Sequence, residues 1–357
     1  MNIDALFKIN PYSLGKKEKS KLLSNYLAEL TRHHYMKSVH YKTMVDALNF
    51  DVNSEVTYTE LPFLPVRLFK LNDLSSIADK DIFKTMTSSG TSGQQVSKIF
   101  LDKETSLRQT KVLAKIVSEF IRPTRSPMII LDSMSVLKDR NMFSARGAGI
   151  LGFSMFGTKR VYALNENMEL DIESLNAFVK DHQESRIFIF GFTFMIYKHF
   201  IKELQKKKIK LDLSNAVLIH GGGWKKLESQ SISSVEFKKV LNNLTGIKSV
   251  FDYYGMVEQT GAICMECEYG HLHTSIFSDI IIRRPYDFSV AEIGEIGIIQ
   301  TVSILPKSYP GHSLLTEDEG ILLGEDDCQC GRLGKYFKVI GRLNNAEIRG
   351  CSDTYAS

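Results

Sequence analysis

No apolar run in the sequence is long enough to cross a bilayer. The longest runs, such as residues 128–131 and 187–194, are far shorter than the roughly 20 residues that a spanning helix needs. Residues 1–12 also lack the basic segment followed by an apolar segment that marks a secretory signal. We therefore expect a cytoplasmic protein without a membrane span.

The sequence also has little excess charge of either sign. Its 45 Lys and Arg residues outnumber its 41 Asp and Glu residues by four, an excess too small over 357 residues to indicate nucleic-acid binding. Hydrophobic residues make up 43% of the chain and charged residues 24%, which is typical of a soluble globular protein. The length suits one large domain or two modest ones.

No cysteine occurs before residue 264, so all five cysteines lie in the last third of the chain. In a reducing cytosol, clustered cysteines favour metal binding or catalysis over disulfides. Close pairs of thiolates and imidazoles suit tetrahedral Zn²⁺. We expect the ligands of a structural zinc ion to be Cys267, His273, Cys328 and Cys330. Cys264 and His271 are the alternative ligands, and buried free thiols are the alternative to a metal.

From residue 85 onward, short apolar segments alternate with segments of helical periodicity. The expected strands are residues 98–101, 128–131, 186–190, 216–219 and 249–253. The expected helices are residues 105–121, 169–181, 193–206 and 228–242. This alternation predicts an α/β fold with a largely parallel sheet flanked by helices.

The ends of the chain have a different character. Apolar residues recur at helical spacing over about residues 16–48, which predicts a helix that covers the sheet. After residue 275 the strand-like segments are 279–282, 296–302 and 336–340. We therefore expect four parts, namely a helical cap (1–70), an α/β nucleotide-binding core (71–275), a smaller β-rich subdomain (276–345) and a tail (346–357).

A loop rich in Ser, Thr and Gly is the first candidate for nucleotide binding. Glycines let successive backbone N–H groups face one anion, hydroxyls add donors, and a nearby lysine adds positive charge. The residues concerned are Ser88, Ser89, Gly90, Thr91, Ser92, Gly93 and Lys98. The loop is not the Walker-type P-loop, because no lysine follows Gly93 directly. On composition alone, a flexible surface loop is equally consistent.

Two further motifs follow expected strands, where ligands of open α/β sheets bind. The first is the glycine run of Gly221, Gly222 and Gly223, which would let a flat ligand approach the backbone. The second contains Tyr253, Tyr254, Gly255 and Glu258. An aromatic ring there would stack on a base, and the carboxylate would hold Mg²⁺ bound to phosphates. A tight turn and core packing are the competing explanations.

Three residues near the end of the chain complete the candidate set. Asp318 and Arg342 suit ribose hydroxyls and phosphate, although each alone would be an ordinary surface charge. Cys351 would take up an acyl group, because a thiolate is a strong nucleophile. An inert surface thiol is the alternative for Cys351.

Taken together, the order of these motifs resembles the acyl-adenylate-forming ligase superfamily. The matching segments are the loop at 88–93, the glycine run at 221–223, Tyr-Gly-x-x-Glu at 254–258, Thr-x-Asp at 316–318 and Gly-Arg at 341–342. Within it, residues 62–70, the glycine run with Trp224 and Lys225, and the Gly350–Cys351 pair resemble the LuxE-type acyl-protein synthetase family. The cysteine set is instead similar to that of the phenylacetate–CoA ligase and CapK-like branch.

The resemblance implies an adenylate-forming-ligase-like fold whose mobile C-terminal domain is absent or truncated. That domain usually carries a catalytic lysine, so Lys98, a partner or Mg²⁺ would supply positive charge instead. It also implies that Cys351 accepts the acyl group. The cofactors expected are ATP, Mg²⁺ and structural Zn²⁺.

The function we expect is ATP-dependent activation of a carboxylic or fatty acid as an acyl-adenylate, followed by transfer to a thiol. The catalytic residues would be Cys351, Glu258 and Lys98. The final acceptor would be a reductase or a carrier protein. One alternative is a ligase that transfers the acyl group to coenzyme A, a carrier-protein thiol or an amine. Another is a non-catalytic subunit, stabilised by zinc, that binds nucleotide or a partner.

Overall fold

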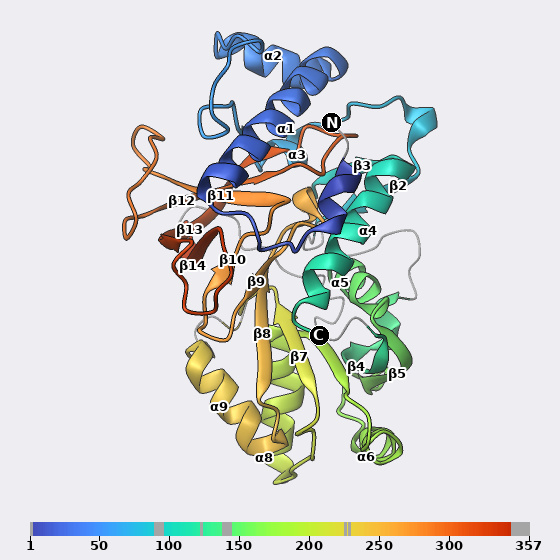
Figure 1. Cartoon of the computed structure of the whole chain (residues 1–357). Helices are drawn as coiled ribbons and strands as arrows, with labels where there is room; N and C mark the ends of the chain where they lie inside the picture. The colour runs from blue at the N-terminus through green and yellow to red at the C-terminus, as the bar shows by residue number, and fades with distance from the viewer. Residues whose placement is uncertain are drawn as a thin grey trace. The chain divides into compact units, whose positions relative to one another are not determined.

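The computed structural model describes residues 3–88, 96–121, 124–137, 145–224, 227 and 230–343 (Figure 1). The chain forms two compact units. Unit 1 comprises the described residues of Met1–Ile116 and Gly255–Glu347, and unit 2 those of Val117–Tyr254. Among the described residues, no helix combines the length and the apolar character that crossing a membrane needs.

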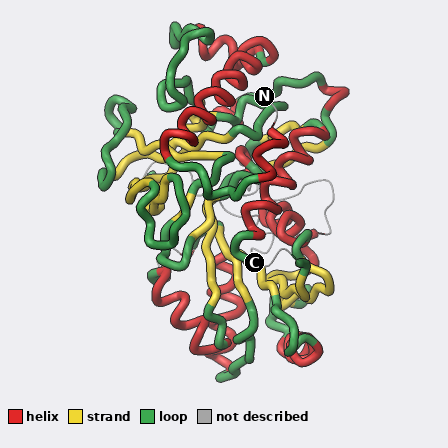
Figure 2. The backbone as a smooth tube through the Cα atoms, in the orientation of Figure 1, coloured by secondary structure: helices red, strands yellow, loops and turns green. Residues whose placement is uncertain are grey.

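Unit 2 is built on a parallel sheet. In spatial order its strands are β8 (Ser249–Tyr254), β7 (Val217–Gly221), β6 (Phe188–Phe192), β4 (Ser126–Ser133) and β5 (Gly157–Leu164). Every residue of β6 and β7 is buried, as expected for central parallel strands covered on both faces. In Figure 2 the strands of this unit (yellow) are flanked by helices (red).

Two of the helical elements of unit 2 begin at a residue whose side chain caps the helix, and one of these two also ends at a glycine. The helical elements of the unit are η3 (Met134–Leu137), α5 (Ala145–Ser154), α6 (Ile172–Asp181), α7 (Thr193–Met195), η4 (Ile196–Ile201), α8 (Lys202–Lys207) and α9 (Ser234–Thr245). The side chain of Asp171 accepts the N–H of Ser174 at the start of α6, and Ser233 caps α9 in the same way. Gly246, with φ of 73°, ends α9 in the left-handed conformation.

Unit 1 contains an antiparallel sheet. Its strands are β11 (Ser278–Arg283), β12 (Ile296–Ser303), β13 (Ser313–Glu325), β14 (Lys335–Arg342), β10 (Leu272–His273) and β9 (Cys264–Glu266), in that order. The short strand β1 (Leu64–Pro65) pairs in parallel with β13. A separate hairpin joins β2 (Lys84–Thr87) and β3 (Lys98–Leu101).

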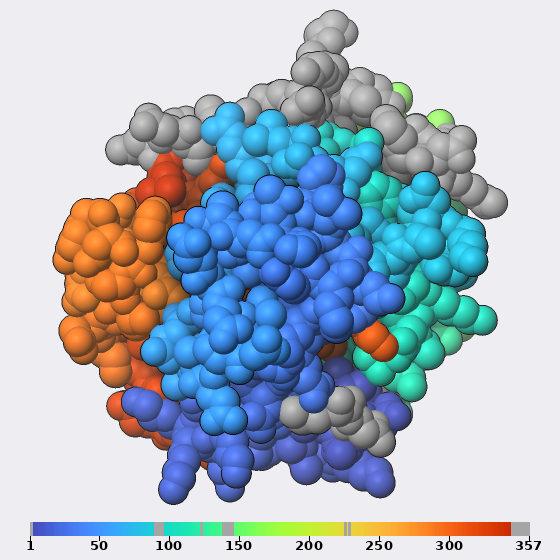
Figure 3. Space-filling model, turned by 90° about the horizontal axis from the view of Figure 1, so that it is seen from above, coloured from blue at the N-terminus to red at the C-terminus, as the bar shows by residue number. Residues whose placement is uncertain are grey.

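N-terminal helices cover this sheet. The helical elements of unit 1 are η1 (Ile3–Lys8), α1 (Lys16–Lys37), α2 (Val39–Ala47), α3 (Leu68–Leu71), η2 (Asp79–Asp81) and η6 (Val257–Gln259), and α4 (Lys103–Ser118) leads from unit 1 into unit 2. Leu23 and Leu27 of α1 are fully buried, and Thr31 of α1 bonds His312 at 3.0 Å. Figure 3 shows α1 and α2 (blue) spread over the face turned to the viewer.

The structure refines several predictions about elements. The expected helix 16–48 is divided at Ser38, which has extended φ and ψ and whose side chain accepts the N–H of Tyr41. The strands β5 and β13 and the helix α5 had no counterpart in the sequence prediction. The alternation of parallel strands and helices is confirmed in unit 2, but the expected strand 98–101 forms β3 of the separate antiparallel hairpin instead of joining the parallel sheet. The predicted core 71–275 contributes residues to both units, and the predicted domain boundaries stay a prediction.

Candidate functional site

Glu258 lies in the 3₁₀ turn η6 and is completely buried. Among the described residues, neither oxygen of its carboxylate has a hydrogen-bond partner. Its backbone carbonyl accepts a hydrogen bond from the Tyr309 hydroxyl at 2.9 Å. Buried charged groups are normally paired, hydrogen-bonded or bound to metal, so this carboxylate has the environment of a cation ligand.

The turn that carries Glu258 is held rigidly. Gln259 donates to the carbonyls of Thr301 and Gly311 at 3.1 and 2.9 Å. Gly261 has φ of 93°, and a Cβ atom there would lie 2.5 Å from the carbonyl oxygen of Gln109. Only glycine allows this backbone conformation and this close approach of α4. No local motif marks the supporting residues Tyr309 and Gln109, so they were not predicted from the sequence.

The predicted phosphate loop is described only at its borders. The N–H of Ser97 donates to the Ser88 hydroxyl at 2.9 Å, and the N–H of Ser88 donates to the Ser97 carbonyl at 3.0 Å. These bonds close the base of the loop at the end of the β2–β3 hairpin. Lys98 is exposed and forms an ion pair with Asp73 at 3.3 Å. Five predicted phosphate ligands lie outside the described residues, namely Ser89, Gly90, Thr91, Ser92 and Gly93.

The glycine run after β7 packs closely against aromatic rings of unit 2. A Cβ atom at Gly221 would lie 2.6 Å from the Tyr253 ring, and one at Gly222 would lie 2.8 Å from Phe192. Gly222 and Gly223 have φ of 81° and 65°, and nothing lies within 4 Å of a Cβ atom at Gly223. Gly221 is therefore required by packing, and Gly223 by backbone conformation.

The residues around this glycine run form a polar and aromatic group. The Nδ1 atom of His220 lies 3.0 Å from the Thr193 hydroxyl and 3.5 Å from the Asp252 carboxylate. Burial lowers the pKa of His220 to about 3, so the ring is neutral at pH 7. The Tyr253 ring lies 5.3 Å from that of Phe153. Thr193 begins α7 and was not among the site residues predicted individually from the sequence.

Asp318 and Arg342 are brought together by the register of β13 and β14, in which they are direct partners. The guanidinium of Arg342 forms ion pairs with Glu317 at 2.9 Å and with Asp318 at 3.5 Å. The N–H of Asp318 donates to the hydroxyl of Thr316, which donates to the Ile299 carbonyl at 2.7 Å. A fixed carboxylate next to a fixed guanidinium suits a ligand that offers hydroxyls and a phosphate.

The predicted nucleotide ligands are thus distributed between the two units. Those in unit 1 are Ser88, Lys98, Gly255, Glu258, Asp318 and Arg342, and those in unit 2 are Gly221, Gly222, Gly223, Tyr253 and Tyr254. Cys351 lies outside the described residues. That the predicted nucleotide ligands of both units converge on one bound nucleotide remains a prediction.

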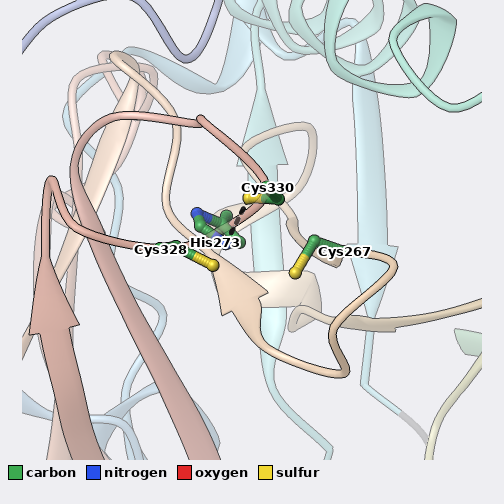
Figure 4. Close-up of side chains that lie close together, drawn as sticks. All are labelled: Cys267, His273, Cys328 and Cys330. Carbon is green, nitrogen blue, oxygen red and sulfur yellow. Dashed lines mark hydrogen bonds between the residues drawn. The ribbon is translucent and has the colours of Figure 1, made fainter.

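The four predicted zinc ligands come together in unit 1. The donor atoms of Cys267, His273, Cys328 and Cys330 all lie within 4.8 Å of one another. Cys267 follows β9, His273 lies on β10, and the other two cysteines lie in the turn after β13. Figure 4 shows the three sulfur atoms and the imidazole facing a common space.

The two alternative ligands have different positions. His271 Nδ1 lies 3.4 Å from Cys328 Sγ, which makes it a neighbour of the cluster. Cys264 is buried on β9 outside the group of four, and burial raises its pKa to about 12. Burial also raises the pKa of Cys328 to about 12. At Cys330 burial acts in the same direction, but hydrogen bonds from Arg332 outweigh it and lower the pKa.

Comparison with known proteins gives matches over nearly the whole chain. The family model described as "Acyl-protein synthetase, LuxE" matches residues 1–357. The long-chain-fatty-acid–luciferin-component ligase of Aliivibrio fischeri is 22% identical over 99% of this chain and 93% of its own length. The enzyme of the same name from Vibrio harveyi is 22% identical over 98% of this chain and 91% of its own.

Solved structures share the fold at low identity. A 2-hydroxyisobutyryl-CoA ligase, in complex with its acyl-adenylate, matches with a TM-score of 0.72 and 13% identity over 94% of this chain and 70% of its own. ATP-bound MatB from Rhodopseudomonas palustris matches with a TM-score of 0.50 and 14% identity over 75% of this chain and 49% of its own. The chain therefore has an α/β fold of the kind found in these ligases.

Proposed function

The chain belongs to the LuxE acyl-protein synthetase family, and we propose that it uses ATP to activate a fatty or other carboxylic acid and transfers the acyl group to a thiol. The names of the two curated relatives support a long-chain fatty acid as the substrate class. The fold that the chain shares with a ligase bound to an acyl-adenylate supports an adenylate intermediate.

The buried carboxylate of Glu258 is the observation that carries this proposal. It is fully buried, and neither oxygen is hydrogen-bonded within the described part of the chain. A carboxylate in this state suits Mg²⁺, which prefers oxygen ligands and commonly binds through one or two carboxylates plus substrate phosphates. When bound, Mg²⁺ would neutralise phosphate charge. We therefore assign Glu258 as its protein ligand.

In the first step, an oxygen of the substrate carboxylate attacks the α-phosphorus of ATP. The bond from that phosphorus to the bridging oxygen breaks, and pyrophosphate leaves. Catalysis of this step is mainly positioning and charge neutralisation. The loop 88–93 would hold the leaving phosphates, and Lys98 would add positive charge after exchanging its partner Asp73. Asp318 and Arg342 would bind the ribose of ATP.

The base would bind beside the glycine run. Backbone atoms of the glycine run, Gly221, Gly222 and Gly223, would contact the adenine. The rings of Tyr253 and Tyr254 would restrict the position of the adenine. The Tyr253 backbone N–H already donates to the Asp252 side chain at 2.8 Å. The pairing of β8 with β7, in which Tyr253 is the partner of Gly221, fixes the backbone of that segment before any ligand binds, which lowers the entropy cost of binding.

In the second step, a thiolate attacks the carbonyl carbon of the acyl-adenylate. The bond between that carbon and the phosphate oxygen breaks, AMP leaves with the electron pair, and the thiol proton passes to solvent. We propose Cys351 as the nucleophile, so that the enzyme carries the acyl group as a thioester before a partner reductase or carrier protein receives it.

Pyrophosphate exchange into ATP, measured with a panel of carboxylic acids of increasing chain length, tests the first step. We expect Glu258→Gln to reduce exchange by about 100-fold or more, because it removes a charged ligand at the reacting phosphates. Glu60→Gln is the matched control, because Glu60 is an exposed glutamate of the same unit and has no role in the proposed site. Exchange at the wild-type rate in Glu258→Gln would refute the assignment.

Intact-mass measurement after incubation with ATP and an acid tests the second step. The wild type should gain the mass of one acyl group, and Cys351→Ser should not, although its exchange activity persists. An acyl adduct that survives in Cys351→Ser would exclude the tail cysteine. ATP binding without exchange for any acid would instead indicate a non-catalytic nucleotide-binding protein.

A further inference from the structure

The corner of unit 1 around the cysteine cluster has almost no apolar core of its own. The buried residues that pack together there are Cys267, Cys328 and Tyr336, with Leu323 and Cys330 against them. Cysteine side chains therefore stand where a domain would normally place large aliphatic residues. A segment with so little core needs another source of stability, such as a metal ion.

We propose that Cys267, His273, Cys328 and Cys330 bind one Zn²⁺ ion, which fastens the β13–β14 turn to the β9–β10 hairpin. This inference is independent of the proposed ligase activity, because none of the four residues belongs to the nucleotide or acyl machinery described above.

The chemistry of the donor atoms indicates which metal would bind. Three sulfur donors and one imidazole lie within 4.8 Å of one another, and His273 Nε2 lies 3.3 Å from Cys330 Sγ. Sulfur and nitrogen donors of this kind suit zinc, whereas Mg²⁺ and Ca²⁺ require oxygen ligands. Four protein ligands also complete a tetrahedral site. No coordination position then remains for substrate, so the ion would be structural.

The surroundings match the charge and geometry of such a site. Three thiolates around Zn²⁺ leave a net charge of −1, and Arg332 lies against Cys330 while it bonds Glu268 at 2.8 Å. Tyr336 stacks on His273 at 5.5 Å with an interplanar angle of 24°. These contacts hold the ligands in place before the metal binds, as outer-shell groups commonly do.

The segments joined by the cluster are distant in the sequence. Cys267 and Cys328 belong to different hairpins. Two hydrogen bonds close the turn after β13. The N–H of Gly331 donates to the Cys328 carbonyl at 3.0 Å, and the N–H of Gly334 donates to the Asp326 carboxylate at 2.7 Å. At its other end, the β13–β14 hairpin carries Asp318 and Arg342. A metal at the turn would therefore limit fraying of the hairpin that positions those two residues.

Zinc content of the purified, reduced protein is the first test, with Cys264→Ser as the matched control. Cys264 is a buried cysteine on the adjoining strand but stands outside the cluster. We expect one zinc per chain in the wild type and in Cys264→Ser, and loss of zinc in Cys328→Ser and Cys267→Ser. Equal losses in Cys264→Ser and Cys328→Ser would overturn the assignment.

A second measurement needs no variant. Wild-type protein stripped with a chelator and titrated with Co²⁺ should develop sulfur-to-cobalt charge-transfer and tetrahedral absorption bands that saturate at one equivalent. Hydrogen exchange of residues 267–273 and 326–336 should slow on adding Zn²⁺, while that of β6 stays unchanged. A titration without these bands, or protection spread evenly over both units, would refute the structural site.

Discussion

The two units differ in what is buried inside them. The interior of unit 2 is mainly apolar and aromatic, and the Phe153 and Phe190 rings stack at 4.2 Å. Unit 2 also buries an ion pair, but unit 1 buries a larger charged network that includes Lys19, Asp279 and Lys335, which are 2%, 1% and 9% exposed. Apolar burial is non-directional and tolerates small changes, whereas buried polar groups depend on each partner. Unit 1 should therefore respond more strongly to single substitutions and to solution conditions.

Asp279 is the centre of the charged network in unit 1. Its Oδ1 lies 3.4 Å from Lys19 Nζ, and its Oδ2 lies 3.3 Å from Lys335 Nζ. It also accepts hydrogen bonds from Tyr58 at 2.6 Å and Thr274 at 2.9 Å. Burial alone would raise the pKa of Asp279, but the two lysines lower it to about 2. One carboxylate thus compensates two buried ammonium groups and connects α1 to the sheet.

Asp279→Asn should destabilise the protein more than any other single substitution proposed for either unit. It leaves Lys19 and Lys335 buried without a counter-charge, and we expect the free energy of unfolding to fall by about 3–5 kcal/mol. Urea denaturation monitored by circular dichroism would measure the change.

The control for Asp279→Asn is Asp46→Asn. Asp46 forms an exposed ion pair with Lys42 at 2.6 Å, one helical turn away on α2. Exposed pairs contribute little, so this variant should match the wild type. A loss of stability at Asp46 as large as that at Asp279 would show that burial does not distinguish the two pairs.

The pairing around Asp279 also shows where prediction from sequence ends. Apolar runs such as 128–131 and 216–219 predicted β4 and β7 because buried parallel strands are apolar throughout. Lys19 and Asp279 carry no such signal, since they are 260 positions apart and each resembles a surface charge. Only the tertiary fold makes them partners.

The candidate site also shows how far prediction from the sequence can go. Spacing was enough to predict that cysteines and histidines would cluster, because close ligand pairs are typical of zinc. It favoured His273 and left His271 as the alternative, and the structure places His273 in the group of four, although the rings of both histidines stack on Tyr336. Strand β13 was missed because its charged stretch at 317–319 is stabilised by pairing with β12 and β14.

Acid should destabilise unit 1 more than unit 2. In unit 1, the buried rings of His34 and His312 stack at 4.9 Å. Burial lowers the pKa of His312 to about 3 and holds the pKa of His34 well below its usual value, with further contributions from His33. Both rings stay neutral while the unfolded chain takes up protons below pH 6.5. The free energy of unfolding should therefore fall by about 1.4 kcal/mol per histidine per pH unit there.

In unit 2 two shifts oppose each other. Burial lowers the pKa of His220 to about 3 and raises the pKa of Asp132 to about 6, although Arg146 acts against the second shift. Between pH 6 and pH 4, the folded state binds fewer protons at His220 and more at Asp132 than the unfolded chain does. These contributions have opposite signs. Burial also lowers the pKa of His199 in η4, so acid should destabilise unit 2, but less than unit 1, because Asp132 opposes the histidines.

Hydrogen exchange of peptides from β6 and β13 between pH 6.5 and 5 would separate the two responses, after correction for the intrinsic rate. His312→Gln should reduce the pH dependence of unit 1 by about one histidine's contribution and leave that of unit 2 unchanged. An equal acid response in β6 and β13 would contradict this difference between the units.

Close packing in unit 2 predicts a difference between two neighbouring glycines. Gly221→Ala places a methyl group 2.6 Å from the Tyr253 ring, and we expect a loss of about 1–3 kcal/mol from overpacking. The methyl group added in Gly223→Ala would have no atom within 4 Å. The free energy of unfolding of this variant should fall by about 1 kcal/mol, because of the positive φ alone. Thermal unfolding would rank the two. If Gly223→Ala is the less stable variant, backbone strain outweighs packing at this turn.

The smallest effect should come from Ile189→Val on β6, whose side chain is fully buried. Removing one methylene from an apolar core costs about 0.5–1.5 kcal/mol. Because no ionisable group or metal ligand is involved, the same loss should be found at pH 7 and pH 5.5, and with or without added Zn²⁺. Parallel urea titrations under these conditions would measure it. A loss at Ile189 that varies with pH or zinc would mean that the stability of unit 2 depends on the polar clusters of unit 1.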